Sequence, residues 1–141
     1  MSVVTRFAPS PTGYLHAGNY RTAVFAYLFA KHHNGEFIVR IEDTDRERSK
    51  PEYEQNIFDS LLWLELPFDQ KFRQSEHAAR HRELLEKLIA EGKAYISKEA
   101  PKNPGDRDEV IRFKNPGGVV TFTDLVRGDI SIDVSHLHDF I

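Results

Sequence analysis

The sequence predicts an α/β protein whose first part alternates strands with helices and whose second part is rich in short strands. Residues 3–42 contain a strand pattern, a helical pattern and a second strand pattern, an order typical of a βαβ unit with parallel strands and a right-handed crossover. Residues 110–134 contain three short strand patterns separated by turn residues. We therefore expect two regions, residues 1–73 and residues 74–141.

Local signals in residues 3–42 predict a strand, a helix and a second strand. A strand is expected at Val3–Phe7, where β-branched and aromatic residues precede Ala-Pro. A helical pattern runs over residues 20–33 and ends at Asn34-Gly35, which tolerate the left-handed conformation of a helix stop. A second strand follows at residues 36–42. The helix face expected to pack on the sheet holds Tyr20, Val24, Tyr27, Leu28 and Lys31, with Ala23, Ala26 and Ala30 filling in.

A charged loop at residues 43–50 leads into the next helix. Ser49 is the expected N-cap, with Pro51 in the first turn and Glu52 three residues after the serine. A short strand is expected at residues 68–72. The apolar face of the helix between them holds Tyr53, Ile57, Leu61 and Leu64.

The second region begins with a third helix, expected at residues 76–91 and ended by Gly92. A strand at residues 94–96 and a charged loop at residues 97–109 follow. The remaining strands are expected at residues 110–113, 119–122 and 129–134, with a turn at Asn115-Pro116-Gly117-Gly118.

The composition excludes several classes of protein. The 141 residues carry a net charge of -3, which argues against binding nucleic acid mainly by non-specific charge. There is no cysteine, which excludes disulfides and thiolate zinc sites. No apolar run has the length of a membrane span, so we expect a cytoplasmic protein without membrane contact. The predicted parallel sheet has too few strands for a complete nucleotide-binding fold, so we expect a fragment.

The turn between the first strand and the first helix is the first candidate site. Free backbone N–H groups and the helix dipole make such a turn a natural phosphate site. His16 can donate a hydrogen bond to a phosphate oxygen, and Gly18 permits close approach of a ligand to the backbone. A tight turn that needs glycine for its own geometry, with His16 merely exposed, explains the same residues. The spacing leaves both interpretations open.

Two longer motifs resemble those of glutamyl-tRNA synthetases, which are class I synthetases. Residues 6–18, Arg-Phe-Ala-Pro-Ser-Pro-Thr-Gly-Tyr-Leu-His-Ala-Gly, resemble the N-terminus of that family, and residues 40–49, Arg-Ile-Glu-Asp-Thr-Asp-Arg-Glu-Arg-Ser, resemble its second strand and following loop. Residues 73–76, 91–95 and 122–128 match later landmarks. The resemblance implies the N-terminal half of a Rossmann-like catalytic fold, followed by the start of a β-rich acceptor-stem-binding insertion.

The same resemblance implies substrates and roles. The full-length enzyme would use L-glutamate, ATP with Mg²⁺ and tRNA(Glu), form glutamyl-adenylate and transfer the glutamyl group to the 3′ end of the tRNA. Arg6 would hold a carboxylate of glutamate and Glu42 its α-ammonium; the alternative is an ion pair between these two residues across adjacent strands. Ala8 and Ser10 would line the amino-acid site. The catalytic pair would be His16 and Gly18, and the nucleotide site would hold Ser10, His16, Gly18 and Asn19.

A third set of residues, Asp43, Asp45 and Arg48, would face the tRNA, with loop and helix-cap chemistry as the alternative. Many relatives carry a zinc-binding insertion after Tyr95; here it is absent, and we expect no zinc and no other metal site. His77 and His81 lie four residues apart on a helix, but no third ligand is evident.

Three other functions are alternatives to the interpretation that the chain is a fragment of a glutamate–tRNA ligase. They are a glutamyl-queuosine-type tRNA-modifying paralogue, a glutaminyl synthetase and a non-catalytic nucleotide- or RNA-binding module. The second half of the catalytic fold, with its Lys-Met-Ser-Lys-Ser-type loop, has no counterpart in residues 1–141. We therefore expect weak ligand binding and little or no aminoacylation by the isolated chain, and a monomer for the full-length form.

Overall fold

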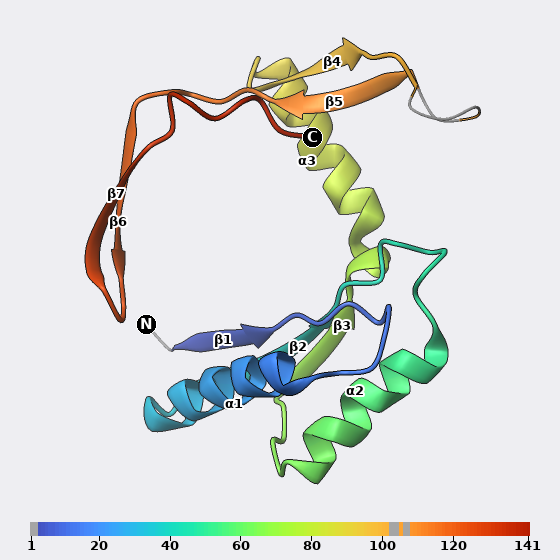
Figure 1. Cartoon of the computed structure of the whole chain (residues 1–141), viewed down its shortest axis with the longest axis vertical. Helices are drawn as coiled ribbons and strands as arrows, with labels where there is room; N and C mark the ends of the chain where they lie inside the picture. Colours follow the sequence, from blue (N-terminus) through green and yellow to red (C-terminus); the bar gives the residue numbers. More distant parts are fainter. Residues whose placement is uncertain (1–2, 102–104, 106–107) are drawn as a thin grey trace. The chain divides into compact units, whose positions relative to one another are not determined.

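The computed structural model describes residues 3–101, 105 and 108–141 (Figure 1). The chain forms two units, Met1–Ala79 and Arg80–Ile141. The expected domain boundary between residues 73 and 74 stays a prediction. The elements of the first unit are β1 (Val4–Phe7), α1 (Ala17–His32), β2 (Glu36–Ile41), α2 (Pro51–Trp63), β3 (Gln70–Arg73) and the 3-10 helix η1 (Gln74–His77).

The first unit is a three-stranded parallel sheet in the order β1-β2-β3 (Figure 1). This confirms the predicted α/β alternation. Alternate residues of β2, Phe37, Val39 and Ile41, are buried in one core with Ala23 and Ala30 of α1. Ile57 and Leu61 of α2 join the same core. Both helices therefore cover the same face of the sheet, as two right-handed crossovers in one direction require.

The opposite face of the sheet presents the other set of alternating residues. Arg6 of β1 pairs in register with Ile38 of β2, and paired residues point to the same side of a sheet. Arg6 is exposed, whereas Ile38 and Arg40 are half-buried. This face therefore holds the charged side chains of the two strands.

The start of α1 differs from the prediction by three residues and the N-cap of α2 by one. Helix α1 begins at Ala17 instead of Tyr20, because His16 serves as its N-cap. Helix α2 has Lys50 as its N-cap, and the Lys50 side chain makes no capping hydrogen bond. Ser49, the expected cap, lies one residue outside the helix, and its buried hydroxyl has no hydrogen-bond partner within the described residues.

The turn from α1 to β2 brings the chain close to β1. Asn34 adopts a positive φ of 51°, which confirms the predicted helix stop. The next residue, Gly35, donates its N–H to Ala30 O at 2.8 Å, and Glu36 N–H donates to Val3 O at 2.9 Å. A Cβ on Gly35 would lie 2.1 Å from the carbonyl oxygen of Val3.

We expect Gly35→Ala to destabilise the first unit. The new methyl group cannot fit without moving β1 or the turn, and such overpacking lowers the free energy of unfolding by about 1–3 kcal/mol. Urea unfolding followed by circular dichroism measures the loss. The matched control is Gly13→Ala, because no described residue other than its two chain neighbours lies within 4 Å of a Cβ at Gly13. Equal midpoints for the two variants would contradict the expectation.

The second unit contains most of helix α3 (Ala78–Ala90) and two antiparallel strand pairs, which confirms the β-rich region. Strand β4 (Ala94–Lys98) pairs with β5 (Glu109–Phe113), and β6 (Val119–Asp124) pairs with β7 (Gly128–Asp133). The expected loop at residues 97–109 lies partly outside the described residues. No helix in the described part of the chain combines the length and the apolar character needed to cross a membrane.

Candidate active site

Two loops meet at the carboxyl ends of β1 and β2, where open parallel sheets bind their ligands. The loop after β1 contains Pro9 and Pro11, both buried. Glu42 N–H donates to Pro9 O at 2.9 Å, and Lys50 N–H donates to Pro11 O at 3.0 Å. These backbone bonds hold the first loop, residues 8–16, against the second loop, residues 42–50.

Arg6 and Glu42 lie at the ends of adjacent strands but do not form the ion pair that was the alternative to substrate binding. Glu42 instead pairs with Arg40 of its own strand: Nε and Nη2 of Arg40 lie 2.6 and 2.5 Å from Glu42 Oε1. Within the described residues, the guanidinium of Arg6 has no hydrogen-bond or ion-pair partner, and the second carboxylate oxygen of Glu42 accepts no hydrogen bond. The site therefore offers an unpaired guanidinium and a carboxylate oxygen that is free to accept a hydrogen bond.

His16 is oriented by its role as N-cap. Its Nδ1 accepts a hydrogen bond from Gly18 N–H at 3.2 Å, and its own N–H donates to Asn19 Oδ1 at 3.1 Å. When Nδ1 of a neutral imidazole accepts, Nε2 carries the proton and can donate. The exposed ring is thus held in the tautomer that suits an anionic ligand at the start of α1.

Gly18 has a structural reason to be glycine. A Cβ there would lie 3.0 and 3.1 Å from Cε1 and Nδ1 of His16, so a larger residue would press on the capping ring. The geometric explanation and the nucleotide-binding explanation of this glycine are therefore compatible. The other expected site residues of the first loop are Ala8, half-buried, and Ser10, exposed.

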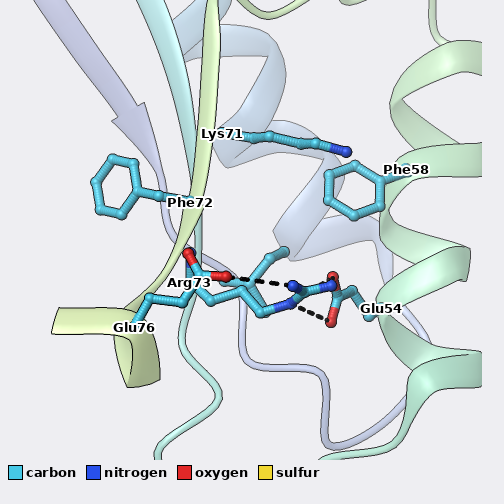
Figure 2. Close-up of a pocket in the computed structure, with 7 residues that line it drawn as sticks. Glu54, Phe58, Lys71, Phe72, Arg73 and Glu76 are labelled. Atoms are coloured by element: carbon cyan, nitrogen blue, oxygen red, sulfur yellow. Dashed lines mark hydrogen bonds and ion pairs between the residues drawn. The ribbon is translucent and has the colours of Figure 1, made fainter. Parts of the chain in front are cut away.

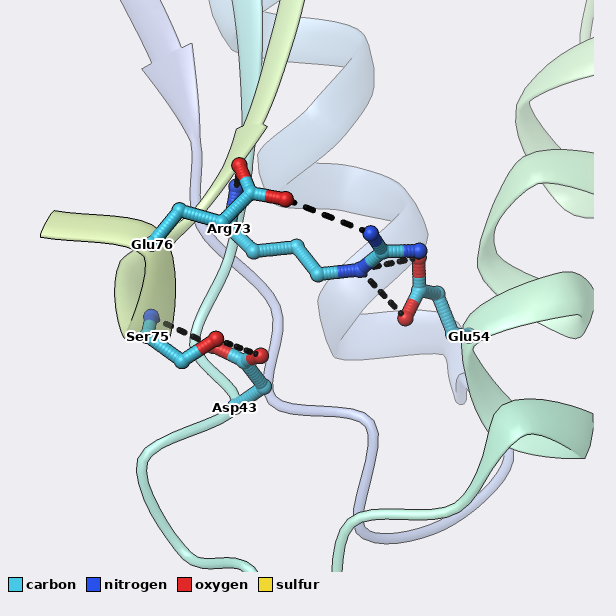
Figure 3. Close-up of polar contacts among 5 residues, drawn as sticks. All are labelled: Asp43, Glu54, Arg73, Ser75 and Glu76. Atoms are coloured by element: carbon cyan, nitrogen blue, oxygen red, sulfur yellow. Dashed lines mark hydrogen bonds and ion pairs between the residues drawn. The ribbon is translucent and has the colours of Figure 1, made fainter.

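The third set of predicted site residues makes two separate contacts, one by Asp45 with Arg48 and one by Asp43 with Ser75. Asp45 bonds Arg48 in its own exposed turn, with Arg48 Nε 2.6 Å from Asp45 Oδ2. The Arg48 side chain and backbone hydrogen bonds lower the pKa of Asp45 below its ordinary value. Asp43 instead reaches Ser75, as Figure 3 shows, and accepts from its backbone N–H at 2.8 Å and its hydroxyl at 2.5 Å. That Asp43 faces the tRNA stays a prediction.

A second group of charged residues, to which the sequence motifs assign no role, lies beside this site. Arg73 lies between two carboxylates in Figure 2, with Nη2 2.7 Å from Glu54 Oε1 and Nη1 3.3 Å from Glu76 Oε1. The same residues line a cavity of about 110 Å³ together with Phe58 and Lys71, whose ammonium lies 4.9 Å from the ring centre. The three-residue spacing of Arg73 and Glu76 is a local signal for their capping contact. No local pattern indicates the contact between Arg73 and Glu54.

No group of three or more metal-binding side chains occurs among residues 3–101, 105 and 108–141. That the protein needs no zinc stays a prediction.

The comparison with known protein families agrees with this geometry. Residues 2–103 match the family described as tRNA synthetases class I (E and Q), catalytic domain. The chain belongs to this family. The predicted resemblance and the class I synthetase fold are therefore confirmed.

Curated members of this synthetase family include the glutamate–tRNA ligases of Legionella pneumophila (strain Lens) and Aquifex aeolicus. The Legionella enzyme is 48% identical over 170 residues that include 100% of this chain and 36% of the relative. The Aquifex enzyme is 42% identical over an alignment that covers 99% of this chain and 37% of the Aquifex enzyme. The chain thus spans little more than a third of the length of these relatives.

A solved structure shares the fold as well. The crystal structure of a glutamate tRNA ligase from Elizabethkingia meningosepticum in complex with its amino acid matches with a TM-score of 0.88 and 30% identity. The match covers 99% of this chain and 38% of that one.

Proposed function

We propose that this chain forms one wall of a glutamate–tRNA ligase site that binds L-glutamate and ATP. The observation that carries the proposal is the unpaired guanidinium of Arg6 at the end of β1, beside a Glu42 carboxylate oxygen at the end of β2 that accepts no hydrogen bond within the described residues. The guanidinium of Arg6 binds a carboxylate of glutamate, a task for which its planar fork of donors is suited. The free oxygen of Glu42 accepts the α-ammonium, and Ala8 and Ser10 line the space between.

The nucleotide lies at the start of α1. Nε2–H of His16 donates to a phosphate of ATP, Gly18 lets the base approach the backbone, and Ser10 and Asn19 border the same space. ATP enters with Mg²⁺ on its phosphates. A glutamate α-carboxylate oxygen attacks the α-phosphorus, pyrophosphate leaves, and the terminal ribose hydroxyl of tRNA(Glu) then displaces AMP. The protein contributes positioning and charge, so no nucleophilic side chain is needed.

Further features of the proposal concern the whole enzyme. Asp45 and Arg48 face the 3′ end of the tRNA, the full-length protein is a cytoplasmic monomer, and no zinc is required. Because the chain spans 36% of the Legionella relative, the isolated chain binds its small substrates weakly and charges tRNA little or not at all.

Titration of the ¹⁵N-labelled chain tests the proposal. We expect L-glutamate to shift the amide signals around residues 6 and 42 with a Kd on the order of 1 mM, and ATP to shift those of residues 16–19. N-acetyl-L-glutamate is the matched control ligand, because it keeps both carboxylates and lacks the ammonium that Glu42 accepts. Its binding should be at least about tenfold weaker.

Two outcomes would overturn parts of this proposal. Absence of any glutamate shift at about 10 mM would remove the proposed amino-acid site. Aminoacylation of tRNA(Glu) by the isolated chain at a rate on the order of 1 per second would overturn the expected lack of activity.

A further inference from the structure

We propose that Asp43 is a positioning residue, which acts through Ser75 to fix the place of Glu42 at the carboxyl end of β2. The proposal rests on the proposed role of Glu42 in binding glutamate. It assigns Asp43 a task inside the fold, and it adds Ser75 and Arg73 to the residues on which the amino-acid site depends.

The bond between Asp43 and Ser75 joins two elements that are distant in the chain. Asp43 follows β2, whereas Ser75 lies in η1, 32 residues later. Each carboxylate oxygen accepts one hydrogen bond, from Ser75 N–H at 2.8 Å and from Ser75 Oγ at 2.5 Å. Hydrogen bonds to an ionised acceptor are among the stronger ones in proteins. Among the described residues, the Asp45 side chain bonds only within its own turn, so of these two aspartates only Asp43 reaches another element through its side chain.

Glu42 is consequently held from both sides. Its own N–H donates to Pro9 O at 2.9 Å, which ties it to the loop after β1. The residue after it is tied to the end of β3 through Ser75, and its side chain is held by Arg40. A displacement of about 1 Å in a substrate-binding group is enough to lose much of its effect.

Ser75 in turn is held by the clamp formed by Glu54, Arg73 and Glu76, shown with Asp43 in Figure 3. Arg73 bonds both carboxylate oxygens of Glu54 on α2, with Nε 3.0 and 3.1 Å away and Nη2 2.7 Å from Oε1. Glu76 accepts from Arg73 Nη1 and from its backbone N–H, both at 3.3 Å. The first turn of η1 is thereby anchored to α2.

The charge state of Asp43 agrees with this arrangement. Burial alone would raise the pKa of the Asp43 carboxyl, but the hydrogen bonds from Ser75 and the charge of Arg73 hold the pKa below its ordinary value. Asp43 therefore stays ionised at neutral pH and keeps both acceptor oxygens for Ser75.

The test combines ligand affinity with local amide exchange in the 141-residue chain. For Asp43→Ala we expect at least a tenfold loss of L-glutamate affinity and at least tenfold faster exchange of the Glu42 amide. ATP affinity should stay within twofold, and so should amide exchange at Phe37 and Val39 in the core. Ser75→Ala keeps the backbone donor and should show a smaller effect, and Ser75→Thr, which keeps the hydroxyl, should restore the parental values.

Asp59→Asn is the matched control, because it removes the same charge from an exposed position on α2 where, within the described part of the chain, Asp59 accepts a hydrogen bond from Gln55 alone. Unchanged glutamate affinity and unchanged Glu42 exchange in Asp43→Ala would overturn the proposal. If Asp43→Ala loses protection in the core, the milder variants Asp43→Asn and Ser75→Ala are measured instead. Weaker glutamate binding with faster Glu42 exchange in these variants supports the proposal, and parental values in both overturn it. If the parental chain binds no glutamate, the proposed function fails, and exchange at Glu42 alone decides the positioning role.

Discussion

Replacing Arg6 by alanine is expected to weaken L-glutamate binding by about 100-fold, which places it beyond the reach of a titration. A hydrogen-bonded charge pair contributes about 1.5–3 kcal/mol, and tenfold in affinity is about 1.4 kcal/mol. Arg6 can deliver this because it is exposed and is not neutralised by Glu42, which pairs with Arg40. The measurement is the titration of the labelled chain with L-glutamate.

A conservative variant and a control separate the fork geometry of Arg6 from its charge. Arg6→Lys keeps the charge but loses the two parallel donors, so we expect an intermediate loss of about tenfold. Arg82→Ala removes an exposed arginine of the second unit and should leave glutamate affinity unchanged. ATP should bind all of these variants equally. Full glutamate affinity in Arg6→Ala would show that the carboxylate binds elsewhere.

The order of the elements was predictable because it depends on local signals. Apolar periodicity placed the three parallel strands and their helices, and the stops at Asn34 and Gly92 are both residues with positive φ, 51° and 68°. The start of α1 was not predictable in this way. Histidine is not among the usual N-cap residues, so the cap formed by His16 has no compositional signal, and the helix was placed three residues too late.

The packing face of α1 shows a second limit of pattern reading. Leu28 was placed on the core side by its hydropathy, but it is 56% exposed. The fully buried positions are Ala23 and Ala30, beside the half-buried Tyr27. Small side chains let a helix lie close to a sheet, and this preference cannot be read from hydrophobicity alone because leucine scores higher than alanine.

The contacts at the site also differ in whether a local sequence pattern could have predicted them. Alternation along β2 puts Arg40 and Glu42 on one side of the strand, so their pairing could have been predicted from the spacing of two residues. Parallel pairing also brings Arg6 to the same face. The contact of Glu54 with Arg73 spans 19 residues and that of Asp43 with Ser75 spans 32. Both depend on how α2 and η1 pack, which no local pattern specifies.

Phe37→Ala is expected to lower the free energy of unfolding of the first unit by about 3–5 kcal/mol. Phe37 is fully buried on β2, the central strand, between β1 and β3. Its ring meets that of Tyr27 edge to face, with centroids 5.6 Å apart. Removing the ring leaves a cavity in the only core that joins both helices to the sheet among the described residues of this unit. A small domain has about 5–15 kcal/mol of stability in total, so this loss consumes much of it.

Guanidinium unfolding measures this loss of free energy of unfolding in Phe37→Ala and compares it with the parental chain and two further variants. Phe37→Leu keeps most of the volume and should cost less than about 1.5 kcal/mol. Phe25→Ala removes the same ring from α1 at a position that is 69% exposed, so the free energy of unfolding should change by no more than about 0.5 kcal/mol. A loss for Phe25→Ala that equals the loss for Phe37→Ala would mean that the exposed side of α1 is covered in solution. The core between the sheet and its two helices would then not be the principal source of stability.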